Sequence, residues 1–220
     1  DSGVTRGTLR VTAPDALGRR LLLPTVYRFM ERWPEMQIEM SFSDRVDSVV
    51  EKGFDLSIRI GVHPPNEGLI TRTLLQAQVF LCAAPSYFEK RDRPENIEQL
   101  GRHDLLQFAS RGQRQSWHLQ ETDGTWVRAE GRVRLRLDSA GALREAALAG
   151  LGIALLPQLL VRTDIAEGRL EHVLPRVNPG TVPVIALYPH KRLLEPRVRR
   201  FIDMVNGDLR NQGNCQENRA

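Results

Sequence analysis

Cysteine, lysine and aromatic residues are all scarce in this sequence. The 220 residues include two cysteines, and only three of the 31 basic residues are lysines (Lys52, Lys90 and Lys191). Cys82 lies in an apolar run and Cys215 in a polar tail, so they do not form the disulfide framework of a small secreted domain. The cysteine content therefore indicates a reducing compartment, and we expect the cytoplasm.

Long apolar runs are also absent. The longest, Val79–Ala84, is typical of a buried strand and falls far short of the roughly 20 residues that span a bilayer. The opening segment Asp1–Gly7 is polar and does not resemble a signal peptide, although a leader removed before this point stays an open alternative. With 41% hydrophobic and 26% charged residues, the composition is that of a globular protein and excludes a disordered or fibrous chain.

The basic charge does not by itself indicate a nucleic-acid surface. The net charge is +4, and the arginines are scattered among acidic residues. Arg132, Arg134 and Arg136 alternate as they would on one face of a strand, and no aromatic residue for stacking on bases lies between them. This pattern favours the solvated face of an edge strand over a site for nucleic acid.

Motifs for catalysis and metal binding are missing. No two of the five histidines have the i, i+4 spacing of a helical zinc site. Ser139 lies in half of a nucleophile elbow, but the first glycine is lacking, so it is better interpreted as a helix N-cap. The glycines of Gly150–Leu155 precede a predicted strand, whereas the glycines of a dinucleotide-binding fingerprint follow a strand. We therefore expect no enzyme, no metal and no cofactor.

The order of predicted elements indicates an α/β fold. Strands at 9–13, 37–42 and 54–61 alternate with helices at 22–33 and 45–52, which is the rhythm of a parallel sheet covered by helices. The rest of the chain again mixes strands and helices. The predicted strands there are 69–75, 78–84, 103–109, 117–121, 126–128, 133–137, 152–156, 170–174 and 183–188, and the predicted helices are 86–90, 94–100, 140–149, 157–166 and 195–209.

Two helix starts, one after strand 9–13 and one at Ser139, indicate a binding site for a small carboxylate. Ligands bind beyond the carboxyl ends of strands in open sheets, and free N–H groups at helix starts favour anions. Arg59 would either add charge to this site or form a surface salt bridge, and Phe108 would either line the site or join the core. Asp15 would either cap the first turn or select against strong anions.

Several segments resemble the effector-binding domain of LysR-type transcriptional regulators. The opening Gly7–Pro14 and the segment Phe54–Gly61 are similar to two of that family's motifs, and Ala146–Pro157 is similar to its most recognisable stretch. Leu81–Tyr87 and Pro196–Phe201 resemble the family's interlobe strand and its ending. The resemblance extends in order from about Gly7 to Leu209.

The resemblance implies a type 2 periplasmic-binding-protein-like fold, with two Rossmann-like lobes joined by two crossover strands and a cleft between them. Lobe I would comprise residues 7–83 and 188–210, and lobe II residues 84–187. Residues 1–6 would end a linker, and residues 211–220 would form a disordered tail. The implied effector-binding residues are Ala13, Pro14, Asp15, Ala16, Leu17, Ser43, Arg59, Ile60, Gly61, Phe108 and Ser139.

The same resemblance implies a sensor of a small organic acid or related metabolite that reaches promoter DNA only through a winged helix-turn-helix absent from this chain. It also implies self-association as a homodimer, and possible tetramers of the full-length protein. We expect helix 21–33, with its additional apolar residues Leu21, Leu23 and Tyr27, and the alanine-rich helix 140–149 to form the dimer surface beside strand 37–42. The alternative is a solute-binding protein of a transporter, which would share the fold.

Overall fold

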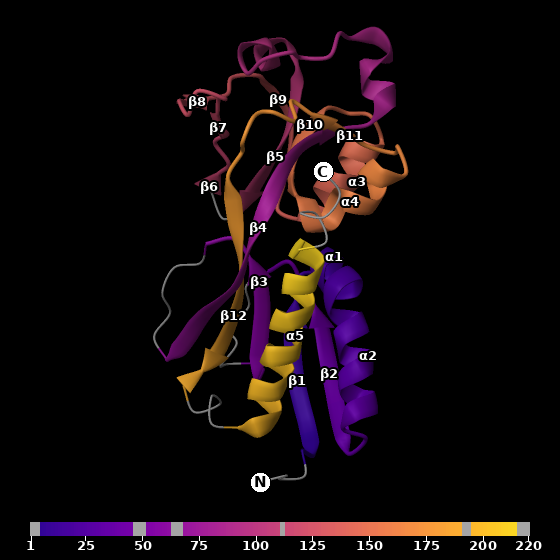
Figure 1. The fold of residues 1–220 in the computed structure, drawn as a ribbon, viewed down its shortest axis with the longest axis vertical. Coiled ribbons are helices and arrows are strands. Elements are labelled where there is room, and N and C mark those ends of the chain that lie inside the picture. The colour runs from indigo at the N-terminus through magenta and orange to yellow at the C-terminus, as the bar shows by residue number, and fades with distance from the viewer. Residues whose placement is uncertain (1–4, 46–51, 63–67, 111–112, 191–194, 215–220) are drawn as a thin grey trace. The chain divides into compact units, whose positions relative to one another are not determined.

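A computed structural model describes residues 5–45, 52–62, 68–110, 113–190 and 195–214. The chain forms two compact units (Figure 1). Unit 1 comprises Asp1–Gln76 and Val182–Ala220, and unit 2 comprises Ala77–Thr181. The chain leaves unit 1 within strand β4 (Leu69–Ala83) and returns to it at the beginning of strand β12 (Thr181–Pro189). The boundaries predicted from the sequence, 83/84 and 187/188, fall in or next to the same two strands.

Unit 1 contains a parallel sheet of the predicted kind. Strand β1 (Gly7–Ala13) pairs in parallel with both β2 (Met36–Phe42) and β3 (Leu56–Ile60), and β12 pairs antiparallel with β3. Most of β3 is buried because it lies between β1 and β12, and the buried residues include the polar Ser57 and Arg59. The predicted helix at 45–52 lies almost entirely outside the described residues.

The helix that follows β1 begins earlier than predicted, immediately after the strand. It comprises α1 (Asp15–Leu17), a π-helical turn (Gly18–Leu22) and α2 (Leu23–Arg32). The apolar residues at 3–4 spacing predicted the helix only from Leu22 onward, although Leu17 and Leu21 before it are also buried. The residues before Leu22 were not predicted as part of the helix, because Pro14 and Asp15 are typical of turns as well as of helix starts.

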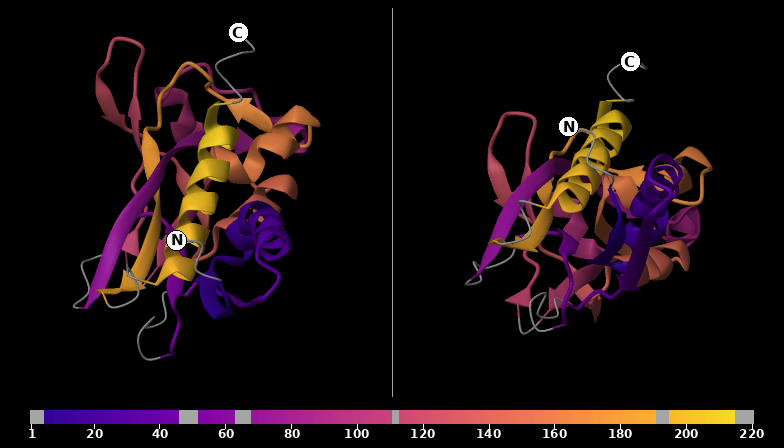
Figure 2. Two further views of the ribbon diagram at one scale, coloured as in Figure 1. Left: turned by 60° about the horizontal axis from the view of Figure 1, so that its bottom comes forward. Right: turned by 90° about the horizontal axis from the view of Figure 1, so that it is seen from below.

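Helix α5 (Pro196–Asn214) packs beside α2 (Figures 1 and 2). The rings of Phe29 and Phe201 meet edge to face at 5.3 Å, and both side chains are buried. Asp208 of α5 accepts hydrogen bonds from Thr25 and Arg28 of α2. Helix α5 continues to Asn214, so the prediction of a disordered tail is wrong for residues 211–214. The remainder of that tail lies outside the described residues.

Unit 2 is organised around β5 (Asp104–Ser110), which pairs in parallel with β9 (Arg132–Leu137) and β10 (Ile153–Pro157). Strand β4 pairs antiparallel with β10 and with β11 (Glu171–Val173). The other elements of this unit are β6 (Gln113–Arg114), β7 (His118–Gln120), β8 (Trp126–Arg128), α3 (Ala140–Leu148), α4 (Gln158–Ala166) and 3₁₀ helices at Pro85–Lys90 and Glu98–Arg102.

The prediction of two strands at 69–75 and 78–84 is wrong, because β4 is one continuous strand of 15 residues. The predicted break at Gln76 and Ala77 contains neither glycine nor proline, so no residue interrupts the extended backbone there. The pattern of apolar and polar residues changes at Gln76 and Ala77 because the strand passes there from unit 1 to unit 2.

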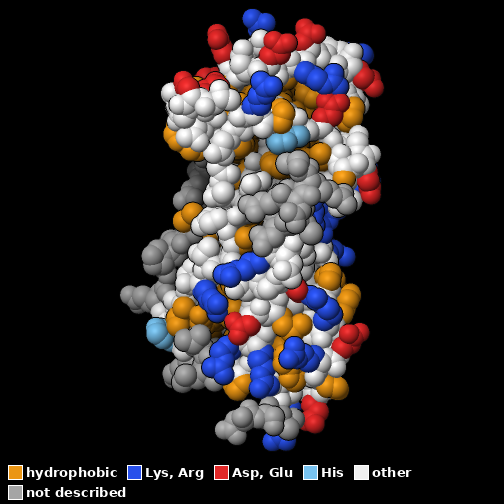
Figure 3. Space-filling model, in the orientation of Figure 1, with side chains coloured by type: hydrophobic (Ala, Val, Ile, Leu, Met, Phe, Trp, Pro, Cys, Tyr) orange, Lys and Arg blue, Asp and Glu red, His pale blue; other side chains and the backbone are white. Residues whose placement is uncertain are grey.

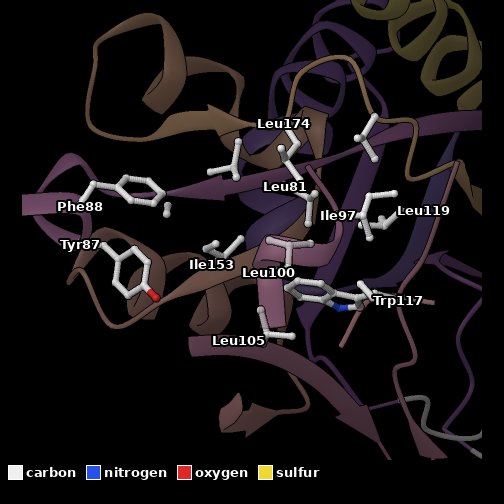
Figure 4. Close-up of a cluster of buried hydrophobic side chains, with 14 residues drawn as sticks. Leu81, Tyr87, Phe88, Ile97, Leu100, Leu105, Trp117, Leu119, Ile153 and Leu174 are labelled. Atoms are coloured by element: carbon white, nitrogen blue, oxygen red, sulfur yellow. The ribbon is translucent and has the colours of Figure 1, made fainter. Parts of the chain in front are cut away.

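The core of unit 2 is a cluster of buried side chains that includes the indole of Trp117 (Figure 4). Leu81, Leu100, Leu105 and Ile153 are each at most 1% exposed in this cluster. The indole N–H of Trp117 donates to Oε1 of Gln115 at 3.1 Å, so the buried polar group is satisfied. This core fixes the inner strands whose ends carry the candidate site residues.

Surface charge is mixed on the face shown in Figure 3, where basic and acidic side chains are interspersed. Arg132, Arg134 and Arg136 are exposed on β9, which pairs with β5 alone among the described strands, so the predicted solvated face of an edge strand is confirmed. No helix within the described residues is long and apolar enough to cross a membrane.

Candidate functional site

In unit 1 the predicted site residues gather at the carboxyl edge of the parallel strands, around the side chain of Arg59. Its Nε donates to Oγ of Ser57 at 2.9 Å, and its Nη2 donates to Oγ1 of Thr12 at 2.9 Å. Its Nη1 donates to the carbonyl oxygen of Ser43. The Ser43 N–H in turn donates to the carbonyl oxygen of Ala13 at 2.8 Å. One guanidinium group thus connects the ends of β1 and β3 with the segment that follows β2.

One of the two sequence interpretations of Arg59, a surface salt bridge, does not describe this arrangement. Its side chain is 2% exposed, so it does not form a surface salt bridge. Its three named hydrogen bonds are to protein atoms, and they hold the edge of the sheet in one geometry. Arg59 is therefore a positioning residue in this structure.

Sequence reasoning missed Thr12 and Ser57, the two hydroxyl partners of Arg59. They face each other in register on β1 and β3, and both are buried. In the sequence both lie at the polar positions of alternating strands, in step with Arg10 and Arg59, so the pattern predicts exposed side chains and gives no signal of burial. A buried hydroxyl requires a hydrogen-bond partner, and Arg59 supplies it.

The first helix begins directly at this edge. Pro14 is its N-cap, and no side chain caps it, so the prediction that Asp15 caps the helix is wrong. The Asp15 carboxylate instead accepts from Nε of Arg19 at 2.7 Å. Pro14, Asp15 and Ala16 are half-buried, and their neighbours Ala13 and Leu17 are buried.

Gly18 allows this helix to lie close to β2. A Cβ atom at Gly18 would lie 2.6 Å from Cε1 of Phe42, so a larger residue would displace the ring or the helix. The Gly18 N–H donates to the carbonyl oxygen of Pro14 at 2.7 Å, which closes the first turn. The close approach keeps the start of the helix next to the ends of β1 and β2.

Ile60 and Gly61 complete the edge in unit 1. Ile60 ends β3, and both residues are half-buried. Gly61 has a φ of 104°, which favours glycine, and its N–H donates to the carbonyl oxygen of Pro183 at 2.9 Å. This hydrogen bond ties the end of β3 to β12.

In unit 2, Ser139 and Phe108 lie at the carboxyl edge of β9 and β5. Oγ of Ser139 accepts from the N–H of Ala142 at 3.2 Å, which confirms the predicted cap of α3. Phe108 pairs in register with Leu137, two residues before Ser139, and is half-buried. The cap satisfies one of the free N–H groups of the first turn, so others stay available to a ligand.

A buried ion pair fixes α3 against the segment that contains α4. Arg144 of α3 donates from Nε and Nη2 to the two carboxylate oxygens of Asp164, each at 2.7 Å, and Arg169 donates to the same group. Burial acts to raise the pKa of Asp164, but the hydrogen bonds from Arg144 and Arg169 lower it overall. The pair keeps the start of α3 in place at the end of β9.

Thiol chemistry is not available at Cys82. Its side chain is buried, and burial raises the pKa of the thiol to about 12, so the reactive thiolate is not populated. No group of three His, Cys, Asp or Glu side chains that could hold a metal is found in the part of the chain that the structure describes. The residues at the two edges offer hydroxyl groups, backbone N–H groups and apolar surface, which can bind a ligand.

The predicted site residues thus form two groups, each at the carboxyl edge of the parallel strands of its own unit. Unit 1 holds Ala13–Leu17, Ser43 and Arg59–Gly61, and unit 2 holds Phe108 and Ser139. This placement at strand ends is where open α/β sheets bind ligands.

Comparison with known proteins identifies the class of this domain. Residues 2–210 match the family described as LysR substrate binding domain. The chain is 29% identical over 213 residues to the HTH-type transcriptional regulator YhjC of Escherichia coli (strain K12), covering 96% of this chain and 70% of that protein.

Solved structures agree with this match. The regulatory domain of CrgA, a LysR-type transcriptional regulator from Neisseria meningitidis, superposes with a TM-score of 0.81 at 28% identity, covering 93% of this chain and 99% of that one. The full-length structure of the Vibrio cholerae virulence activator AphB matches with a TM-score of 0.75 at 30% identity over 92% of this chain and 69% of that chain.

The chain belongs to the LysR substrate binding domain family. It has the type 2 periplasmic-binding-protein-like fold of these regulatory domains and corresponds to the regulatory part of the longer relatives. The matched relatives are named as transcriptional regulators, which agrees with the expectation of a domain that senses a small molecule without catalysis.

Proposed function

We propose that this domain senses a small organic anion, such as a carboxylate, through the residues at the carboxyl edges of its parallel strands. The observation that carries the proposal is the start of α3, where Ser139 caps the helix and leaves first-turn N–H groups at the strand end. These groups and the helix dipole favour a carboxylate.

The other residues at these edges support a ligand that is small and only weakly charged. Asp15 lies at the start of the first helix and has a negative charge that Arg19 only partly offsets at the surface. A strongly charged anion would be repelled there. Phe108 and Ile60, both half-buried, offer apolar surface for the carbon skeleton of the ligand.

We infer that the domain acts in the cytoplasm, where it controls a DNA-binding part that this chain does not contain. Support comes from relatives named as HTH-type transcriptional regulators, of which the chain covers about 70%. The alternative is a solute-binding protein of a transporter, which would share the fold. None of the relatives described above is named as a protein of that kind.

The proposal includes self-association through one face of α2. Tyr27 and Met30 are 59% and 41% exposed and lie three residues apart on this helix, so they form one apolar patch. Leu21, which was expected to contribute, is buried in its own unit. On α3, Ala146 and Ala147 are also buried, so only the other face of that helix is available to a partner.

Calorimetric titration with a panel of small mono- and dicarboxylates tests the sensing proposal. The variant Ser139→Ala should weaken the bound carboxylate about fivefold or more, because the hydroxyl group and the helix cap are both lost. The control is Thr122→Ala, which removes a hydroxyl group from the exposed turn between β7 and β8. Equal affinity in wild type and Ser139→Ala would limit Ser139 to a structural role, and a panel without any binder would reject the carboxylate class.

A further inference from the structure

Three arginine side chains meet at one buried carboxylate at the amino end of β5, in unit 2. Asp104, the first residue of β5, is 4% exposed. Arg132 contacts its Oδ1 through Nε and Nη2, each at 2.7 Å. Arg91 and Arg134 contact its Oδ2 at 3.3 and 3.5 Å. Because all three guanidinium groups touch the same carboxylate, they are gathered within a few ångströms of one another.

The positive charge in this cluster exceeds the negative charge. Among the described residues, Asp104 is the one carboxylate with which Arg91, Arg132 and Arg134 pair, so two positive charges stay unbalanced. Each guanidinium group has five N–H donors, and one carboxylate cannot accept from most of them. The side chains of Arg91, Arg132 and Arg134 are 41%, 66% and 52% exposed, so the remaining donors are open to a ligand.

The cluster is held in place by its surroundings. Arg132 and Arg134 lie on β9, and the pairing of β9 with β5 places Arg132 directly opposite Asp104. Arg91 lies over the ring of Tyr87, 4.6 Å from its centre. Tyr87 is buried at the edge of the core cluster (Figure 4), and its hydroxyl accepts from the Asp104 N–H at 2.9 Å. These contacts restrict the side chains of Arg91 and Arg132 before an anion binds.

We propose that Arg91, Arg132 and Arg134 form a binding site for a phosphate dianion, either inorganic phosphate or the phosphate of a small monoester. A monoester at neutral pH carries close to two negative charges, which match the excess of two on the cluster. The planar guanidinium group also matches the geometry of phosphate oxygens.

A nucleic-acid backbone fits this cluster less well than a small phosphate does. Each phosphodiester carries one charge, and successive charges are spread along the strand. The three arginines converge on one point, which favours a single group of higher charge. The cluster lies at the amino end of β5, whereas the candidate effector residues lie at the carboxyl ends of the strands. The proposal is thus independent of the proposed sensing function.

The site can be tested by titrating the domain with inorganic phosphate and with methyl phosphate in a chloride buffer of constant ionic strength. Amide chemical shifts report the binding. We expect saturable shifts at residues next to Asp104 and Arg132 for both ligands. Dimethyl phosphate, which has a single charge, should bind at least tenfold more weakly. Binding should also weaken between pH 7.5 and pH 5, as the phosphate takes up its second proton.

Matched variants distinguish phosphate binding at this cluster from nonspecific attraction to the positive surface. Arg134→Gln and Arg91→Gln should each weaken phosphate about tenfold, whereas Arg128→Gln, which removes an exposed arginine paired with Glu130, should leave the affinity unchanged. Circular dichroism shows whether each variant is folded, and the two single variants provide independent tests. Three outcomes would overturn the proposal: no saturable shifts, equal loss in Arg128→Gln, or tighter binding of a DNA duplex than of methyl phosphate at the same amides.

Discussion

At the scale of single residues, arginine side chains form the hydrogen bonds of two buried charged sites in this domain. Asp164 is fully buried and bonded to Arg144 and Arg169, and Arg59 is buried among Thr12, Ser57 and Ser43. This use explains part of the bias toward arginine over lysine, because a guanidinium group can bond several partners at once. The sequence shows the bias but not which arginines are buried.

Removal of the Asp164 charge should strongly destabilise the fold. The variant Asp164→Asn removes the buried carboxylate partner of Arg144 and leaves it only the exposed Glu145, so the free energy of unfolding should fall by about 3 kcal/mol. Glu145→Gln is the matched control, because Glu145 also pairs with Arg144 but is 72% exposed, and the change should stay within about 0.5 kcal/mol. Denaturant unfolding measures both. Since the folded pKa of Asp164 is lowered, its contribution should be present above about pH 4 and disappear as the pH falls further.

His103 should make the domain less stable in weak acid. Burial lowers its pKa, and the charge of Arg91 lowers it further, so the folded state favours the neutral ring. The unfolded chain then binds more protons below about pH 6.5, and stability should fall there by at most about 1.4 kcal/mol per pH unit.

Unfolding of wild type and His103→Gln at pH 7.5 and 5.5 measures this effect. The variant should lose less stability between the two values than wild type does, and the exposed His118→Gln should behave like wild type. An identical loss in wild type and His103→Gln would contradict the assignment.

At the scale of elements, close backbone approach decides where glycine is required. A Cβ atom at Gly152 would lie 2.5 Å from the carbonyl oxygen of Asp104, and backbone cannot move aside as a flexible side chain can. At Gly207, within α5, no atom of the described residues lies within 4 Å of the same position, apart from its chain neighbours and the backbone of its own helix. Substitution by alanine should therefore destabilise the fold at Gly152 and stabilise it at Gly207.

Gly152→Ala should lower the free energy of unfolding by about 2 kcal/mol, because β10 must shift away from β5. Gly207→Ala should raise it by about 0.5–1 kcal/mol, because alanine loses less freedom in a helix. Thermal unfolding compares the two directly. A destabilised Gly207→Ala would show that α5 contacts something at that position.

Most elements could be predicted from the sequence because their signals are local. The alternation in 9–13 and 37–42 and the cap at Ser139 each depend on a few neighbouring residues. The continuity of β4 and the network around Arg59 depend on residues from distant segments, and no local pattern reveals them. The sequence therefore places the predicted site residues at strand ends, whereas the buried hydrogen-bond partners Thr12 and Ser57 were not predicted.

At the scale of the whole molecule, the exposed patch on α2 predicts a dimer. Light scattering should give twice the chain mass of 24.9 kDa. Tyr27→Glu places a charge in the patch and should yield a folded monomer, whereas Arg32→Gln, at an exposed position on another face of the same helix, should stay dimeric. A wild-type monomer at high concentration would reject the patch as a dimer surface.

The central claim is that a small carboxylate binds at the carboxyl edges of the parallel strands. The most direct measurement is the change in amide chemical shifts when a carboxylate identified by calorimetry is added to the wild-type domain. The account predicts saturable shifts at the first turns of the two helices, in Asp15 and Ala16 after β1 and in Ala140 and Gly141 after Ser139. Saturable shifts confined to other parts of the domain, with these amides unmoved, would contradict it.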